Sequence, residues 1–160
     1  MTQFERPLTA GERAALSPGM AEALDGAGAD PRIVAAPCAY ARIAAIWRGH
    51  LPILSLGQRI FWPAAFDDFS RPGCERHMAI LQHELQHVLE FATGALTPVR
   101  YVLFPKNWIY GYRLRPGARW RDFGAEQRAS IVEDYWRMQH GLKLAEPSLD
   151  HYRLLIPWAK

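Results

Sequence analysis

The chain has 160 residues, of which 49% are hydrophobic and 22% are charged, and its formal net charge is +3. This length and apolar content predict one folded domain with a hydrophobic core, and they exclude a disordered or fibrous chain. The Lys and Arg residues are spread along the sequence without a block, which argues against binding to nucleic acid or to a membrane.

The N-terminus shows no basic region followed by an apolar one, and no stretch reaches the length of a membrane span. We therefore expect a cytoplasmic protein, and the sequence leaves open a specialised export route.

The first third of the chain predicts short elements. Thr9 and Glu12 have the spacing of a capping box, and Ser17 followed by Pro18 is typical of a second helix start. Residues 32–36 favour a strand, whereas residues 39–47 mix alanine with Ile and Trp and fit a helix or a strand equally well.

Residues 51–63 are rich in β-branched, aliphatic and aromatic side chains and predict a strand pair or one bent strand. The best-defined piece is Gln58 to Trp62, and Pro63 is tolerated only at a strand end or edge. An edge strand leaves backbone groups to which an extended peptide can add. We therefore expect a substrate cleft here, lined by Ile60, Phe61 and Trp62.

A single helix is predicted from about Glu75 to Thr93, followed by Gly94 as a stop signal. One side of this helix carries an apolar stripe, formed by Met78, Leu81, Leu85, Val88, Leu89 and Ala92. His83 and His87 project from roughly the opposite side, so we expect them to face a cleft or solvent.

The segment His83-Glu84-Leu85-Gln86-His87 is an H-E-x-x-H motif. Positions i and i+4 of a helix lie one above the other, so both imidazoles can bind one metal ion. Glu84 can then reach a water molecule bound to that ion. The alternative is that these three are ordinary polar residues on a helix surface.

Two aromatic-rich segments follow, residues 99–104 and 108–114, and they predict a hairpin or meander. The next helix is expected to start near Asp122 as N-cap and to end at Gly141.

This last helix offers a third metal ligand. Catalytic zinc sites commonly use three protein ligands and keep one position for water or substrate. We expect Glu126 to be that ligand, and Glu133 or Asp134 to give a hydrogen bond to a ligand histidine. The alternative for Glu133 is an ordinary surface ion pair with Arg137, one turn further on.

The combined pattern resembles the gluzincins, zinc peptidases whose third ligand is a Glu downstream of the histidine helix. More narrowly, four motifs resemble the small bacterial metallopeptidases called Vgr-related proteins. They are Leu8-Thr-x-Gly-Glu-Arg, Gly57-x-x-Ile60-x-x-Pro63, His83-Glu84-Leu85-x-His87-Val88 and Glu126-Gln127-x-Ala129-x-Ile131-Val132-x-Asp134-Tyr135. The resemblance implies a minimal, zincin-like single domain, because only 34 residues follow Glu126.

The predicted fold class is therefore α+β, with a small antiparallel or mixed sheet beside the two ligand-bearing helices. The predicted function is Zn²⁺-dependent hydrolysis of a peptide or protein substrate, with Glu84 moving the proton. Tyr110, Tyr112 and His140 are candidate donors to the oxyanion, and Tyr112 is the predicted catalytic residue beside Glu84. Core packing is the alternative role for the two tyrosines.

Two other functions fit the same sequence. The first is a zinc-binding adaptor or accessory protein without catalysis, serving a bacterial secretion or phage-like system. The second is an interaction domain without a metal, in which the six Trp residues supply core or partner surface. The retained Glu84 favours chemistry, because metal binding alone does not require an acid at that position.

Overall fold

The computed structural model describes residues 4–65, 67–142 and 148–160. Within these ranges the chain forms a four-stranded mixed sheet and seven α-helices, which confirms the α+β prediction. In chain order the elements are β1 (Glu5–Pro7), α1 (Ala10–Ala14), α2 (Met20–Gly26), β2 (Arg32–Val34), α3 (Ala39–Arg48), β3 (Leu54–Leu56), β4 (Arg59–Phe61), α4 (Glu75–Ala92), α5 (Pro98–Leu103), the 3₁₀ helices η1 (Pro105–Trp108) and η2 (Trp120–Asp122), α6 (Ala125–Gln139) and α7 (Leu149–Leu155).

The sheet has the strand order β1-β2-β4-β3. β2 and β4 are parallel, while β1 and β3 pair antiparallel with their neighbours. The strand pair predicted in residues 51–63 is therefore present. The edge strand, however, is β3 and not the segment from Gln58 to Trp62, because β4 is paired on both sides.

The N-terminal capping box is present. Thr9 Oγ1 accepts a hydrogen bond from the backbone N–H of Glu12, and the Glu12 carboxylate accepts one from the N–H of Thr9. The buried carboxylate of Glu12 also binds the Arg6 guanidinium at 2.7 Å through both oxygens, which ties β1 to α1. The second predicted helix start is wrong by two residues, because α2 has Gly19 and not Ser17 as its N-cap. A Cβ at Gly19 would lie 1.9 Å from the backbone oxygen of Trp158.

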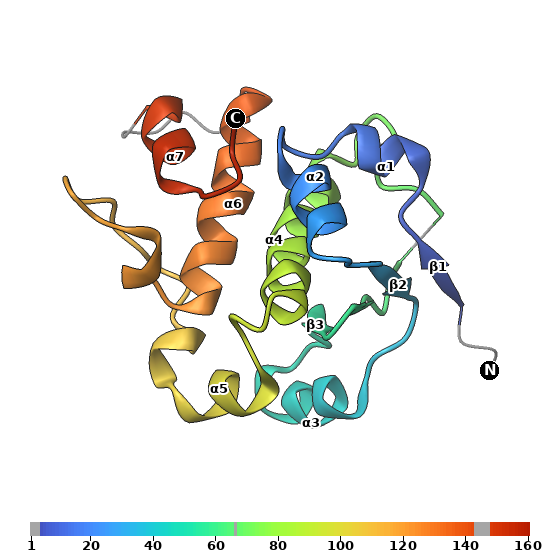
Figure 1. Cartoon of the computed structure of the whole chain (residues 1–160). Helices are drawn as coiled ribbons and strands as arrows, with labels where there is room; N and C mark the ends of the chain where they lie inside the picture. Colours follow the sequence, from blue (N-terminus) through green and yellow to red (C-terminus); the bar gives the residue numbers. More distant parts are fainter. Residues whose placement is uncertain (1–3, 66, 143–147) are drawn as a thin grey trace.

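α4 is the central helix and agrees closely with the prediction (Figure 1). Its C-cap is Thr93, and Gly94 follows with φ of 72°, a left-handed conformation that favours glycine. The predicted apolar stripe packs into the core with Ile33 and Ile60 of the sheet. Consequently α4 lies between the sheet and α6, and contacts both.

α6 starts two residues later than predicted. Asp122 belongs to η2, where its carboxylate accepts a hydrogen bond from the N–H of Arg119. The N-cap of α6 is Gly124, whose Cα sits so close to η1 that a Cβ would lie 2.0 Å from the Lys106 carbonyl oxygen. This contact fixes the first turn of α6, which carries Glu126.

The predicted hairpin over residues 99–114 is wrong. The first part is helical, because Thr97 caps the N–H of Arg100 and Pro98 occupies the first helical turn. The second part, from Ile109 to Arg119, runs outside helices and strands. The ambiguous residues 39–47 form the helix α3. α3 and α5 lie at the same end of the molecule (Figure 1).

Candidate metal centre

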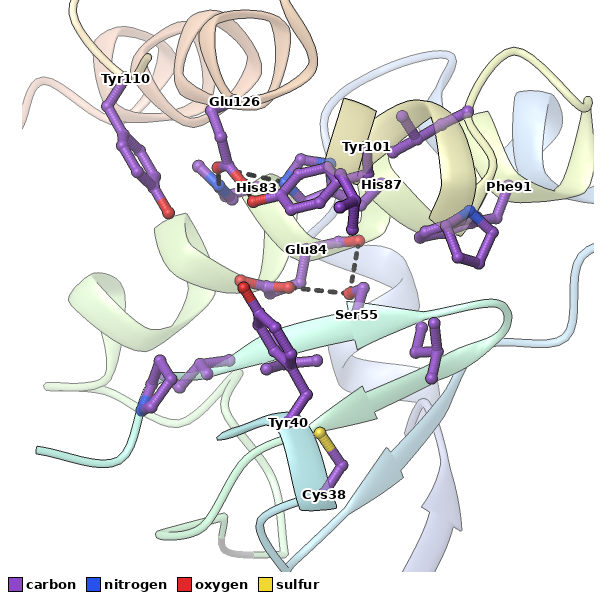
Figure 2. A pocket seen from close by; sticks show the side chains of 17 residues that line it. Cys38, Tyr40, Ser55, His83, Glu84, His87, Phe91, Tyr101, Tyr110 and Glu126 are labelled. Carbon is purple, nitrogen blue, oxygen red and sulfur yellow. Dashed lines mark hydrogen bonds and ion pairs between the residues drawn. The ribbon is translucent and has the colours of Figure 1, made fainter. Parts of the chain in front are cut away.

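Two helices bring two imidazoles and one carboxylate together. Nε2 of His83 lies 3.0 Å from Oε2 of Glu126, and Nε2 of His87 lies 3.3 Å from the same oxygen. One donor atom from each residue lies within 4.8 Å of the others, and all three side chains are buried. The structure thus places the three predicted ligands around one point (Figure 2).

The packing of α4 against α6 determines this convergence. His83 and His87 are one helical turn apart on α4, and their ring centroids are 5.1 Å apart. Glu126 is the second residue of α6, where Asn107 Oδ1 accepts a hydrogen bond from the N–H of Ala125 at 3.1 Å. Asn107 therefore helps to fix the position of Glu126.

A buried ion pair joins the same two helices on another side. Nε and one terminal nitrogen of Arg128 donate to the two oxygens of Glu90 at 2.6 and 2.7 Å. Gln86 donates to the Glu90 carboxylate as well, at 2.8 Å. Arg128 and Glu90 can form both hydrogen bonds only in one relative position of α4 and α6. The ion pair therefore helps to fix how the two helices pack.

The carboxylates around His83 hold a proton on it. Burial favours the neutral imidazole, but hydrogen bonds to Glu126 and Glu133 outweigh burial and raise the pKa of His83 to about 10. Burial also opposes the charged form of Glu126, yet the hydrogen bonds from His83 and His87 lower the pKa of that carboxyl group below its usual range. Both His83 and Glu126 are therefore charged in the cluster, although both are buried.

Two neighbours orient the candidate ligands. Oε2 of Glu133 lies 3.2 Å from Nδ1 of His83, as predicted for a residue that positions a ligand histidine. Glu133 also forms the alternative ion pair with Arg137, at 2.5 Å. On the opposite side, the Tyr101 hydroxyl donates to Oε1 of Glu126 at 2.5 Å, which leaves Oε2 directed at the histidines.

Glu84 points to the other side of the cluster and is held by the sheet. Its Oε2 accepts a hydrogen bond from Ser55 Oγ at 2.8 Å, and Ser55 Oγ also lies 3.1 Å from the Glu84 carbonyl oxygen. Figure 2 shows the Glu84 carboxylate between Ser55 and the ring of Tyr40, below His83. The edge strand β3 thus fixes the rotamer of Glu84.

A cavity of about 230 Å³ opens next to the three candidate ligands. Glu84, His83, His87 and Glu126 are at its polar side. Its remaining walls are mainly apolar or aromatic and come from the start of α3, strand β3 and the residues before it, the C-terminal part of α4, helix α5, and the loop residues Leu96 and Tyr110. The cavity therefore extends from the cluster along β3.

The donor set fits a divalent metal ion. Two neutral imidazole nitrogens and one carboxylate oxygen are ligands that transition metals accept. Both Nε2 atoms are directed at one buried oxygen, so three donors already share one small volume. Nδ1 of His87 is buried without a hydrogen-bond partner within the described part of the chain, so Nε2 is the nitrogen of His87 that meets the other candidate ligands.

Several predicted site residues lie elsewhere, and these predictions are corrected. The Tyr112 hydroxyl donates to Asp134 at 2.5 Å and lies 2.9 Å from the Tyr152 hydroxyl, away from the cavity wall. Burial and the Asp134 carboxylate raise the pKa of Tyr112. Asp134 thus binds the hydroxyl of Tyr112, and of the two acids proposed to hold a ligand histidine, Glu133 is the one seen beside His83. His140 stacks on Trp136 with ring centroids 3.9 Å apart.

The predicted cleft residues are also misplaced. Ile60 and Trp62 are buried in the hydrophobic core, and Phe61, like them, does not line the cavity. The reason is the strand order, because β3 lies between β4 and the open edge of the sheet. The cavity is lined instead by Leu54, Ser55 and Leu56, and not by residues 60–62 as predicted.

Three residues of the site had no role in the sequence predictions, namely Ser55, Tyr101 and Tyr40. Tyr101 fell within a predicted strand, although Thr97 followed by Pro98 is a helix-start signal that would have placed it on a helix facing Glu126. Ser55 carries no local signal, because its role depends on the pairing of β3 with β4 in the register Ser55 to Ile60. Of the three tyrosine and histidine candidates, only Tyr110 lines the cavity, where it stacks on His83.

Comparison with protein family models, with curated proteins and with solved structures gives no match for this chain. Within the described residues, no helix is both long and apolar enough to cross a membrane.

Proposed function

We propose that this chain is a zinc-dependent peptidase of the gluzincin type, with a zincin-like minimal fold. One observation carries the proposal. The Nε2 atoms of His83 and His87 meet Oε2 of Glu126 at the edge of a cavity, with Glu84 on the neighbouring side. This is the residue set that the H-E-x-x-H motif predicts, and it combines metal donors with a proton-transfer group.

Zinc is the proposed metal because of the donor types. Two histidine nitrogens and one carboxylate oxygen are a common set in catalytic zinc sites, whereas calcium and magnesium prefer sites built from oxygen atoms. A structural zinc site would use four protein donors. Within the described residues three donors lie close enough together to share an ion, beside a cavity.

The chain's own groups supply positioning and proton transfer. Zinc at such a site acts as a Lewis acid and lowers the pKa of a water molecule to about 7. Glu84 accepts the proton as the water oxygen adds to the carbonyl carbon, and returns it to the amine nitrogen when the C–N bond breaks. Ser55 holds Oε2 of Glu84 during both transfers, which leaves Oε1 to carry the proton.

Two tyrosines are placed to assist. Tyr110 lies against His83 on the cavity wall, so its hydroxyl is the better candidate for donating to the carbonyl oxygen as charge develops there. Tyr101 is already bound to Glu126 and acts on the ligand instead. Burial and the Glu126 carboxylate raise the pKa of Tyr101, so its hydroxyl stays protonated and remains a donor.

The proposed substrate is an extended polypeptide. β3 is one of the two edge strands of the sheet and the one that lines the cavity, so its outer backbone groups can pair with a chain that adds as a further strand. The apolar part of the cavity then receives an apolar side chain close to the reacting carbonyl. A non-catalytic zinc-binding adaptor would have no use for a carboxylate held in place by Ser55, and this contact favours the peptidase.

The test is cleavage of a mixed library of unstructured peptides by the zinc-loaded chain, followed by mass spectrometry. We expect cleavage next to apolar residues, abolished by a chelator and by Glu84→Gln. A matched control is Glu22→Gln, because Glu22 lies exposed on α2 and does not line the cavity. Cleavage that survives Glu84→Gln, or a zinc-loaded chain that cleaves nothing, would contradict the proposal.

A further inference from the structure

One end of the molecule exposes large apolar side chains on two helices. Ile43 and Ile46 of α3 are 59% and 77% exposed, and Val99 and Leu103 of α5 are 65% and 67% exposed. Phe104 and Trp108 follow α5 and are about half exposed. We call these six side chains the apolar end. The two helices that carry or precede them, α3 and α5, lie at the same end of the fold (Figure 1).

A ligand in the cavity would not cover the apolar end. None of its six residues lines the cavity, although their neighbours Tyr40 and Val102 do. Ile43 and Ile46 share one face of α3, and Val99 and Leu103 share one face of α5, because each pair is three or four residues apart. These faces point outward, because all four side chains are more than half exposed. Exposed apolar patches of this kind mark interaction surfaces.

The charge around the apolar end is of one sign. Residues 31–66 and 91–121 include α3, β3, α5 and η1, and they contain none of the 16 Asp and Glu residues. The same two segments contain ten of the 19 Lys and Arg residues, three of which form ion pairs with acids outside the segments, namely Arg32 and Arg59 with Glu5 and Arg119 with Asp122. Arg42, Arg100 and Lys106 are exposed beside the apolar side chains. The rest of the chain therefore carries a net negative charge.

We infer that the apolar end is a docking surface for an anionic lipid bilayer. Apolar side chains on short helices can enter the boundary between headgroups and acyl chains, while neighbouring Arg and Lys residues bind the phosphate groups. Trp108 suits this boundary, because its ring is apolar and its N–H is polar. This surface binding differs from spanning a membrane, and it departs from the expectation of no membrane contact that the spread of basic residues suggested.

The lipid surface explains two observations together. A soluble acidic partner would account for the positive charge, but it gives no reason for six large apolar side chains to be exposed together on α3, α5 and the segment that follows α5. A bilayer accepts these apolar side chains and binds the neighbouring basic residues at the same time. The inference rests on the exposed side chains and the charge distribution, and it holds whether or not the chain hydrolyses peptides.

The experiment is sedimentation of the full chain with two sets of vesicles, one of phosphatidylcholine alone and one of equal parts phosphatidylcholine and phosphatidylglycerol. We expect binding to the second set, weak binding to the first, and release by high salt. The double variant Ile46→Asp with Leu103→Asp should bind about a hundredfold more weakly, because each of the two aliphatic side chains that enter the bilayer contributes about a factor of ten or more. Arg100→Glu with Lys106→Glu should weaken binding only to the anionic vesicles.

A matched control keeps the test independent of folding. Leu154→Asp places the same charge on α7, at a residue that is 89% exposed and belongs to the opposite end of the fold (Figure 1). This variant should bind vesicles like the wild type, and circular dichroism should be the same for all variants. Equal binding to both vesicle types, or no binding at all, would overturn the inference. Dimerisation that Ile46→Asp with Leu103→Asp removes, without vesicle binding, would assign the surface to a second copy of the chain instead.

Discussion

The hydroxyl of Ser55 donates a hydrogen bond to Oε2 of Glu84 at 2.8 Å, so the edge strand of the sheet holds the carboxylate of the central helix. If Glu84 transfers the proton, Ser55→Ala should lower kcat about tenfold or more and leave KM nearly unchanged, because a hydrogen bond to a charged group contributes about 1.5–3 kcal/mol. Ser55→Thr keeps the hydroxyl and should restore most of the rate. Steady-state kinetics with a peptide found in the library would measure this. Equal rates for Ser55→Ala and the wild type would contradict the role given to Ser55.

Tyr101 orients Glu126, and its loss should weaken metal binding. Its hydroxyl donates to Oε1 of Glu126, so Tyr101→Phe frees that carboxylate to rotate away from the histidines. Removing such a partner typically costs about 10–100-fold in metal affinity. Competition with a zinc indicator would measure the dissociation constant. Tyr40→Phe is the matched control, since Tyr40 lines the cavity but is not among the described residues that hydrogen-bond to His83, His87 or Glu126, and the affinity of this variant should equal that of the wild type.

Zinc binding should release protons. Both ring nitrogens of His83 face carboxylates, and its pKa is raised to about 10, so the imidazole is protonated at neutral pH before the metal binds. A metal needs the lone pair of one nitrogen, so the proton must leave and apparent affinity should increase as the pH rises toward 10. Calorimetry in buffers of different ionisation enthalpy counts the protons. Glu133→Gln removes one carboxylate from His83 and should reduce the number released. An unchanged number in that variant would show that Glu133 does not hold the proton.

The ion pair between Arg128 and Glu90 should stabilise the packing of α4 against α6. Arg128→Met leaves the buried Glu90 without its cation and should lower the free energy of unfolding by about 3 kcal/mol. The double variant with Glu90→Gln should lose clearly less than the sum of the two single variants, because the buried charge is then gone. Urea denaturation with a chelator present measures this without the stabilising effect of bound metal. If the losses of unfolding free energy in the two single variants simply add in the double variant, Arg128 and Glu90 do not stabilise the fold through their interaction.

The sequence predicted best where one helix carries its own periodic signal. The bounds of α4, its apolar stripe and the placing of His83 and His87 follow from residues three and four apart, and the structure agrees with all three. Glu126 could be predicted as a ligand because a metal site with two histidines requires a further donor, and the next helix offers one. Its real position also depends on Gly124 and Asn107, which make contacts that only the fold creates.

The predictions from sequence were least accurate where contacts between residues far apart in the chain determine the structure. Ile60 and Trp62 looked like edge-strand residues, but their exposure depends on which strand pairs outside them, and β3 does so. Tyr112 looked like a site residue because of its chemistry, yet Asp134 and Tyr152 bind its hydroxyl. Residues 98–103 have the composition of a strand and are helical because of the cap at Thr97. Pairing, capping and side-chain partners thus override local composition in each case.

The central claim is that His83, His87 and Glu126 form a zinc site beside Glu84. The most direct measurement is metal content by elemental analysis of protein purified without added metal, for the wild type, Glu84→Gln and Glu126→Ala. We predict about one zinc per chain in the wild type and in Glu84→Gln, and a clear loss in Glu126→Ala, because only Glu126 among the two acids donates to the ion. A wild type that holds no zinc even after reconstitution, or a Glu126→Ala variant that keeps it fully, would contradict the account.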